Sequence, residues 1–226
     1  MSCPKCRTPL EKGDRLYCEA CDVYYHPPAN IKGKTVDEIG CLDDRLNAFY
    51  AKIGDSTFIV KQPRIDDLPQ IKEALKLASE YTYLRFPSPI WKHAEGSCYL
   101  PLHERGTRGT LYLVMILDGN VVGFSHHKYW PLTEDIQEKE NFPIPIGSIC
   151  GNVELCVIDT YQRQGIGSIY AKVSEYIAKH NNAKFILGET FKEGGMLNIR
   201  VRDGWMNFGE RKAEDGSTRV LIGRAL

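Results

Sequence analysis

Near residue 160 the chain changes from a strand-like pattern, through a glycine-containing loop, to a helix-like pattern. The run VELCVIDT precedes YQRQGIG at positions 161–167, and SIYAKVSEYIAKH follows with apolar residues at helical spacing. The first turn of a helix has unpaired N–H groups and a partial positive charge, so a loop at this position favours an anion. A plain tight turn is the alternative interpretation. The pattern predicts an α/β chain with a strand, a loop and a helix in succession.

From about residue 56 the pattern predicts the order strand, helix, strands, helix, strand, helix, strands. A hairpin is expected where TLYLVMIL and VVGFSHHKYW flank a DGN turn, because Asp-Gly and Gly-Asn supply positive φ angles. Asp66 or Asp67 caps the first predicted helix, and a second, shorter helix is expected within SPIWKHAEG. The remaining predicted elements are a strand at AKFILGE, a helix at MLNIRVRD and closing antiparallel strands at WMNFGER and TRVLIGRAL.

The length of 226 residues suits one well-buried domain with a small appendage. Lys plus Arg equals Asp plus Glu at 29 each, so no global field draws the chain to nucleic acid or to an anionic membrane. The longest apolar run, LYLVMIL, is too short to cross a bilayer, and the first residues lack a signal-peptide core. We therefore expect a cytoplasmic protein with no membrane partner and an unknown oligomeric state.

Two CxxC pairs near the start of the chain predict a small metal module. Cys3 and Cys6 form the first pair, and Cys18 and Cys21 form the second, with a turn expected at Gly13-Asp14 between them. Two such turns supply the four thiolates that structural zinc prefers, whereas a redox role lacks the surrounding strand and helix pattern. Residues 1–34 are thus expected to be a zinc ribbon and linker, folded by the metal.

A stretch between this module and the main domain has apolar residues at intervals of three and four. They begin at Val36 and end at Ile53, with Thr35 and Glu38 placed as a capping box. We predict one connecting amphipathic helix over 35–55, weakened at Gly40, which docks the ribbon to the domain at 56–226.

Residues 56–226 resemble the acetyltransferases of the GNAT superfamily. The resemblance is carried by FIVKQPRIDDLPQI, by ILDGNVVGF and above all by LCVIDTYQRQGIGSIYAKVSEYI. The last run matches the family's acyl-CoA signature, Q/R-x-x-G-x-G/A, at Gln162, Gly165 and Gly167. It implies the GNAT fold, a mixed and mostly antiparallel central sheet flanked by helices. The first 28 residues or so resemble a zinc ribbon, which binds DNA, RNA or protein, or braces a neighbouring domain.

The GNAT resemblance implies that acetyl-CoA binds along the signature strand and loop. The backbone amides of the loop would hold its pyrophosphate, the two glycines would let the backbone approach it, and the strand would hold the pantetheine arm and the thioester carbonyl. Arg163 either contacts a phosphate or is solvated. The residues implied are Leu155, Cys156, Val157, Gln162, Arg163, Gln164, Gly165, Ile166, Gly167 and Ser168.

The proton-transfer groups are less well defined by the sequence. The family often places a base at the positions held here by Val153 or Gly151, neither of which ionises. Glu154 is the candidate base, with a paired or solvent-facing carboxylate as the alternative. His126 and its neighbour His127 are further candidates, since histidine titrates near neutral pH and the two side chains point to opposite faces of a strand.

The sequence also does not identify the general acid that protonates the leaving thiolate. Many family members carry a tyrosine where this chain has Arg200, which cannot act as a general acid and either binds phosphate or substrate, or forms an ion pair. Tyr129, Tyr161 and Tyr170 are alternative acids among which nothing in the sequence selects.

These features favour an N-acetyltransferase that uses acetyl-CoA and an amine-bearing acceptor, either a protein lysine or N-terminus or a small amine. Acidic residues between 134 and 140 favour a cationic acceptor, although such runs are commonly only solvated. The alternatives are a catalytically weak GNAT-fold regulator that binds CoA, nucleic acid or protein, and a GNAT-like enzyme that modifies a nucleobase. The zinc ribbon leaves a nucleic-acid partner open.

Overall fold

The computed structural model divides the chain into two compact units. The first unit comprises Met1–Tyr99, Tyr112–Phe124 and Cys156–Ile166, and the second comprises Leu100–Leu111, Ser125–Leu155 and Gly167–Leu226. The structure describes residues 16–21, 23–25, 31–44, 47–76, 109–134, 145–193, 195–212 and 216–226. The predicted short helix within SPIWKHAEG lies outside these ranges.

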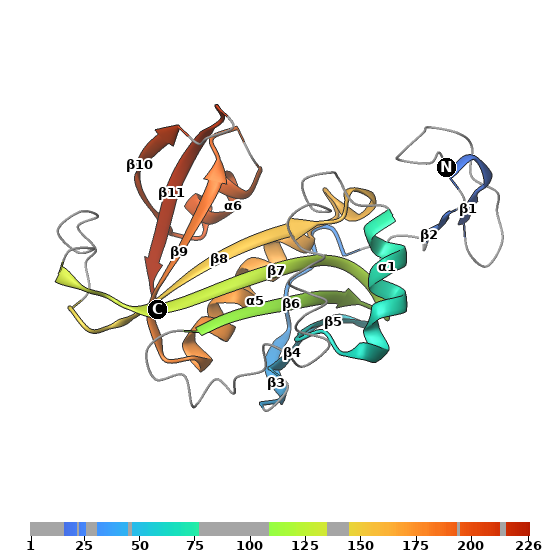
Figure 1. The fold of residues 1–226 in the computed structure, drawn as a ribbon, viewed down its shortest axis with the longest axis horizontal. Helices are drawn as coiled ribbons and strands as arrows, with labels where there is room; N and C mark the ends of the chain where they lie inside the picture. Colours follow the sequence, from blue (N-terminus) through green and yellow to red (C-terminus); the bar gives the residue numbers. More distant parts are fainter. Residues whose placement is uncertain are drawn as a thin grey trace. The chain divides into compact units, whose positions relative to one another are not determined.

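A nine-stranded mixed sheet forms the framework, with the strand order β10-β11-β9-β8-β7-β6-β5-β4-β3 (Figure 1). The pair β8 and β9 is parallel, whereas β3 with β4, β4 with β5, β5 with β6, β9 with β11 and β10 with β11 are antiparallel. The predicted fold class is therefore confirmed. The strands are β3 Glu38–Asp43, β4 Ala48–Ile53, β5 Ser56–Lys61, β6 Gly109–Leu117, β7 Asn120–Pro131, β8 Ile149–Val157, β9 Ala183–Phe191, β10 Met206–Lys212 and β11 Thr218–Ala225.

The helices follow the predicted order. In the described part of residues 56–226 they are α1 Leu68–Lys76, α5 Ile166–His180 and α6 Gly195–Arg202, with 3-10 turns η2 Ile65–Asp67 and η4 Asp159–Tyr161. In α5 the predicted apolar face is buried at Ile169, Val173 and Ile177. None of the described helices has the length and apolar character needed to span a membrane.

The turn between β6 and β7 has the conformation that its sequence requires. Asp118 and Gly119 both have positive φ angles, 47° and 81°, as a two-residue hairpin turn needs. The Asp118 carboxylate also accepts a hydrogen bond of 2.8 Å from the backbone N–H of Thr57 on β5. The predicted hairpin is confirmed.

The predicted helix over 35–55 is wrong, because this stretch forms the antiparallel strands β3 and β4. Asn47, at a φ of 46°, lies in the turn between them, and β4 pairs in turn with β5. Gly40 faces Tyr50 across the pair, and a Cβ at Gly40 would lie 2.6 Å from the Tyr50 ring. Aromatic and β-branched residues beside an available strand partner therefore outweigh the helical spacing of the apolar residues.

Near the start of the chain, β1 Leu16–Cys18 and β2 Val23–Tyr25 form an antiparallel pair around the 3-10 turn η1 Glu19–Cys21. The second CxxC pair thus lies at the closed end of a short hairpin. The first pair, Cys3 and Cys6, and the predicted Gly13-Asp14 turn lie outside the described residues.

Each unit contains buried apolar residues of its own. In the first unit, Phe49, Phe58 and Met115 are fully buried on β4, β5 and β6. In the second unit, Cys150 and Phe185 belong to a buried cluster. These two cores support the strands on which the candidate functional residues lie.

Candidate functional site

The loop that follows β8 is anchored by its own backbone. Ile158 is fully buried, and its N–H donates to the carbonyl of Val122 on β7 at 3.0 Å. Tyr161 is also buried, and its N–H donates to the Ile158 carbonyl at 2.8 Å. Burial raises the pKa of the Tyr161 phenol to about 12. Tyr161 is therefore an anchor for the loop, and this burial makes it a poor proton donor at neutral pH.

Two glutamine side chains fix the exposed part of the loop. The Gln162 amide nitrogen donates to the carbonyl of Val157 at 3.1 Å, and that of Gln164 donates to the carbonyl of Thr160 at 3.2 Å. Each bond joins a glutamine side chain to a backbone carbonyl four or five positions earlier in the chain. The two glutamine side chains therefore hold the loop in shape and make these bonds through backbone carbonyls rather than backbone N–H groups.

The backbone conformation of the loop is typical of an anion-binding turn. Arg163 and Gly165 have left-handed φ angles of 61° and 92°, and α5 begins at Ile166. Left-handed residues alternating with other conformations form a concave row of amides that suits an anion. The first N–H groups of α5 have no partner within the helix and extend this row.

The charge of the loop also fits an anion. Between Asp159 and Glu175 the sequence contains no carboxylate, whereas it contains the cations Arg163 and Lys172. The side chain of Arg163 is exposed. A diphosphate group such as that of acetyl-CoA would therefore find backbone donors and a nearby positive charge in this segment.

The two signature glycines also have close neighbours within the protein. A Cβ at Gly165 would lie 3.3 Å from the Ile31 carbonyl oxygen, and a Cβ at Gly167 would lie 3.0 Å from Cε of Met196. At Gly165 the neighbour is backbone, whereas at Gly167 it is the far end of a flexible methionine side chain, which can move aside. The positive φ at Gly165 is a second reason for glycine there.

The strand β8 places Leu155, Cys156 and Val157 immediately before the loop. Leu155 and Val157 are partly buried and Cys156 is buried. The parallel register of β8 with β9 ends at Val153, opposite Gly188, and β9 continues along β11 (Figure 1). The part of β8 that carries the predicted pantetheine site therefore lies beyond its pairing with β9.

The candidate proton-transfer residues lie on β7 and β8. Glu154 follows Val153 on β8, but its side chain lies outside the described part of the structure, so its role stays a prediction. His126 lies on β7 with 6% of its surface exposed. Adjacent strand residues face opposite sides, so His126 and His127 point away from each other.

His127 belongs to a buried hydrogen-bonded group that sequence reasoning did not assemble. Its Nδ1 lies 3.1 Å from the Tyr129 hydroxyl, and its Nε2 lies 2.5 Å from the Tyr170 hydroxyl. Burial, helped by the positive charges of His126 and Arg200, lowers the pKa of His127 to about 3, while burial raises that of Tyr170. The imidazole is neutral, so one ring nitrogen donates and the other accepts.

Tyr129 also explains why position 151 carries no ionisable side chain. A Cβ at Gly151 would lie 3.1 Å from the Tyr129 ring. The ring therefore fills the space next to β8 where the family resemblance would put a base.

Arg200 on α6 holds α6 against α5. It is 4% exposed, and its guanidinium donates to the Ala171 carbonyl at 3.2 Å and to the Ser174 hydroxyl at 3.1 Å. It also lies 3.8 Å from the Glu175 carboxylate and 4.0 Å from the centre of the Trp205 ring. The ion-pair interpretation of Arg200 is confirmed, and the side chain is engaged within the second unit.

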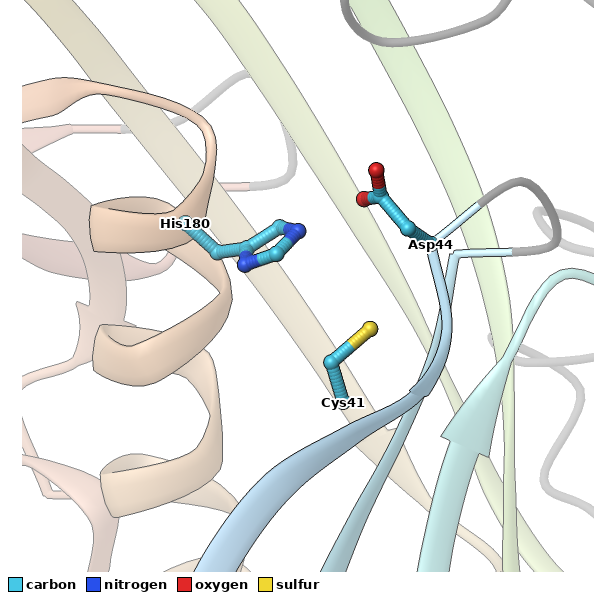
Figure 2. A group of neighbouring side chains, drawn as sticks. All are labelled: Cys41, Asp44 and His180. Atoms are coloured by element: carbon cyan, nitrogen blue, oxygen red, sulfur yellow. The ribbon is translucent and has the colours of Figure 1, made fainter.

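Three further polar side chains are drawn in Figure 2. Cys41 lies on β3 and Asp44 in the turn that follows it, both in the first unit, and His180 is the last residue of α5 in the second unit. Burial raises the pKa of the Cys41 thiol, and its sulfur lies 3.6 Å from the Ala48 carbonyl oxygen. Because these residues belong to different units, we assign no shared site to them.

Comparisons with solved structures identify the fold. The GNAT domain of PAT from S. lividans aligns with a TM-score of 0.50 and 14% identity over 75% of this chain and 91% of that chain. A GNAT-family acetyltransferase from Streptococcus pneumoniae aligns with a TM-score of 0.52 and 11% identity, over 75% of this chain and 99% of that chain. An acetyltransferase from Salmonella typhimurium that modifies the N-terminal serine of ribosomal protein L7/L12 aligns with a TM-score of 0.51 and 12% identity. The alignment covers 75% of this chain and 95% of that chain.

No protein-family model and no curated protein sequence matches the chain. The likeness is therefore one of structure at low sequence identity. Together with the strand order and the parallel pair β8 and β9, it shows that this chain has the fold of the GNAT acetyltransferases.

Proposed function

We propose that this protein is an N-acetyltransferase that transfers an acetyl group from acetyl-CoA to an amine. The observation that carries the proposal is the loop between β8 and α5. Its two left-handed residues, Arg163 and Gly165, and the first turn of α5 offer a row of N–H donors, and the segment from 160 to 174 contains no Asp or Glu. On a GNAT fold this is a site for the diphosphate of CoA.

In this proposal the loop residues Gln162 to Ser168 hold the diphosphate through their backbone. Gln162 and Gln164 act indirectly, since their side chains hold the loop in shape. The pantetheine arm lies along Leu155, Cys156 and Val157, where a backbone N–H of the strand donates to the thioester carbonyl. The end of the β8 register at Val153 supports this placement.

The reaction forms one bond and breaks one. The lone pair of an uncharged amine attacks the thioester carbonyl carbon, the new C–N bond forms, and the C–S bond breaks to release CoA thiolate. The proton lost by the amine is delivered to that thiolate, directly or through the protein and water, so the products are an acetamide and CoA thiol. A backbone N–H beside the carbonyl stabilises the negative charge that develops on oxygen.

Glu154 and His126 are our proposed proton-transfer residues. Glu154 lies one residue before the proposed carbonyl-binding part of β8, and His126 lies on the neighbouring strand β7. Replacing each by Gln should lower kcat by about a hundredfold for a true base, with little change in acetyl-CoA affinity. Unchanged kcat in both variants would show that neither residue has this role.

The acceptor that we propose is a protein amine, an N-terminal α-amine or a lysine, with small amines as the alternative class. Support comes from the structural neighbour that modifies the N-terminal serine of a ribosomal protein. An N-terminal amine titrates lower than lysine, so a larger fraction of it is uncharged at neutral pH. Transfer to N-terminal peptides and to lysine peptides should be compared at equal concentration.

For the N-terminal module we propose one zinc ion held by Cys3, Cys6, Cys18 and Cys21. The hairpin of β1 and β2 supports this, because it places the second CxxC pair in one tight turn. Elemental analysis should give about one zinc per chain, and Cys18→Ser should lower that content. Full zinc content in the Cys18→Ser variant would remove this proposal.

A CoA-binding regulator without turnover is the second candidate function. Arg200, where the family often has a tyrosine, is buried and bonded to α5. Val153 and Gly151 cannot ionise, and Tyr129 covers Gly151. These features favour a weak catalyst.

One assay distinguishes the two functions. Release of CoA thiol from acetyl-CoA should be followed with a thiol reagent, with N-terminal peptides, lysine peptides and polyamines offered in parallel. Thiol release that depends on one acceptor class, with matching acetylated product by mass spectrometry, supports the enzyme. Saturable acetyl-CoA binding without release for any acceptor supports the regulator.

A further inference from the structure

A tight turn at residues 31–34 precedes the GNAT domain. Ile31 is 1% exposed, and its carbonyl accepts a hydrogen bond of 3.1 Å from the Lys34 N–H. Gly33 has a φ of 79° at the third position, as a type II turn requires. Lys32 is therefore the corner residue of a turn that is anchored by a buried neighbour, and its side chain is exposed.

This turn lies directly against the loop after β8. A Cβ at Gly165 would lie 3.3 Å from the Ile31 carbonyl oxygen and 3.5 Å from the Cα of Lys32. The turn and the loop both belong to the first unit. The backbone of Lys32 thus borders the row of N–H groups, although Lys32 lies more than 120 positions before the loop in the sequence.

The charges around the turn distinguish its two lysines. Among the described residues neither Lys32 nor Arg163 has an ion-pair partner. The Nζ atom of Lys34 lies 3.9 Å from a Cβ built on Gly54, in the turn between β4 and β5. Lys34 is therefore directed to another turn, whereas Lys32 and Arg163 belong to the two segments that meet at Gly165.

We propose that Lys32 binds a phosphate of CoA, so that the turn at 31–34, which precedes β3, completes the cofactor site. This inference rests on the proposed function. An ammonium on a flexible four-carbon stem, rooted beside Gly165, reaches an anion held by the loop amides and forms a charge-assisted hydrogen bond. The phosphate is either the diphosphate or the 3′-phosphate of CoA.

The test is calorimetric titration of the full chain with acetyl-CoA and with its 3′-dephospho form. Lys32→Ala should weaken acetyl-CoA binding about tenfold, as expected for one hydrogen bond to a charged group. Lys32→Arg should restore most of the affinity, and Lys34→Ala, the matched control, should change it less than about twofold. Thermal unfolding of each variant confirms that the fold is kept.

The dephospho form identifies the phosphate involved. If Lys32 binds the 3′-phosphate, Lys32→Ala loses affinity for acetyl-CoA but not for the dephospho form, and if it binds the diphosphate, both affinities fall. Wild-type affinity for acetyl-CoA in Lys32→Ala would overturn the inference while leaving the proposed function intact. Tighter binding in Lys32→Ala would also overturn it. Failure of the wild type to bind acetyl-CoA would instead overturn the proposed function itself.

Discussion

The loop after β8 in the first unit and the group around His127 in the second unit are both rich in polar residues, but they use them in opposite ways. In the loop, Gln162 and Gln164 bond to backbone carbonyls, and we propose the backbone N–H groups as the donors to a ligand. Around His127, side chains bond to side chains in the protein interior. The polar groups around His127 are satisfied by one another in the interior, as buried polar groups usually are.

This difference predicts that binding and stability can be changed separately. Substitutions in the loop should alter acetyl-CoA affinity at nearly constant stability, and substitutions in the buried group should alter stability at nearly constant affinity. A variant that moves both quantities together would break the distinction.

The largest expected effect on binding is that of Gly165→Glu. The new side chain meets the Ile31 carbonyl, is strained at a φ of 92°, and adds a negative charge beside the proposed diphosphate site. Titration calorimetry should detect no acetyl-CoA binding, a loss of at least about a hundredfold. Gly216→Glu is the control, because Gly216 also has a positive φ, 77°, but no atoms within 4 Å of its Cβ position. Normal affinity in Gly165→Glu would contradict the site.

The largest expected effect on stability is that of Arg200→Ala. It removes the bonds to Ala171 and Ser174 and one cationic partner of Glu175. The free energy of unfolding, from urea titration, should fall by about 3 kcal/mol. Arg202→Ala is the control, since Arg202 is exposed and pairs with Asp203 at 3.2 Å at the surface. A stability loss equal to that of the control would contradict a buried structural role for Arg200.

His127 predicts how stability depends on pH. The pKa of its imidazole is about 3 in the folded chain, mainly because burial disfavours the charged form, against 6.5 for an ordinary histidine. Between these values the unfolded chain binds a proton that the folded chain does not. Stability is therefore intact above pH 6.5 and falls on acidification, by about 1.4 kcal/mol per pH unit from this residue.

Replacing His127 by Gln should remove that part of the pH dependence. Unfolding should be followed by urea titration between pH 7 and pH 5, the wild type being compared with His127→Gln. His180→Gln, at an exposed histidine, is the matched control for the substitution itself. An unchanged slope in His127→Gln would show that His127 does not titrate as its burial requires.

The smallest expected effect is that of Gln162→Ala. The substitution removes the bond to the Val157 carbonyl and loosens the loop without placing anything in the anion site. Acetyl-CoA affinity should fall about fivefold, equivalent to about 1 kcal/mol, with a smaller change in stability. A complete loss of binding would mean that Gln162 contacts the ligand directly.

Local signals explain why the loop could be predicted from the sequence. Its strand, its glycines and its helix are consecutive, so the positive φ at Gly165 and the helix start at Ile166 follow from short-range rules. The hairpin turn at Asp118-Gly119 was predictable for the same reason.

Contacts between distant segments explain what the sequence did not reveal. His127 meets Tyr170 across 43 positions, and Gly165 meets the turn at Ile31. The segment at 35–55 has helical spacing, yet the pairing of β4 with β5 makes it a strand pair. A sign of the turn at 31–34 was present in the sequence IKGK, where one apolar residue stands before a lysine, a glycine and a lysine.

The most direct test of the central claim is calorimetric titration of the wild-type chain with acetyl-CoA, repeated with acetylated pantetheine, which lacks the phosphates. If the loop after β8 binds the diphosphate, acetyl-CoA binds saturably to one site and acetylated pantetheine binds at least about a hundredfold more weakly. No binding of acetyl-CoA, or equal binding of both compounds, would contradict the assignment of the loop.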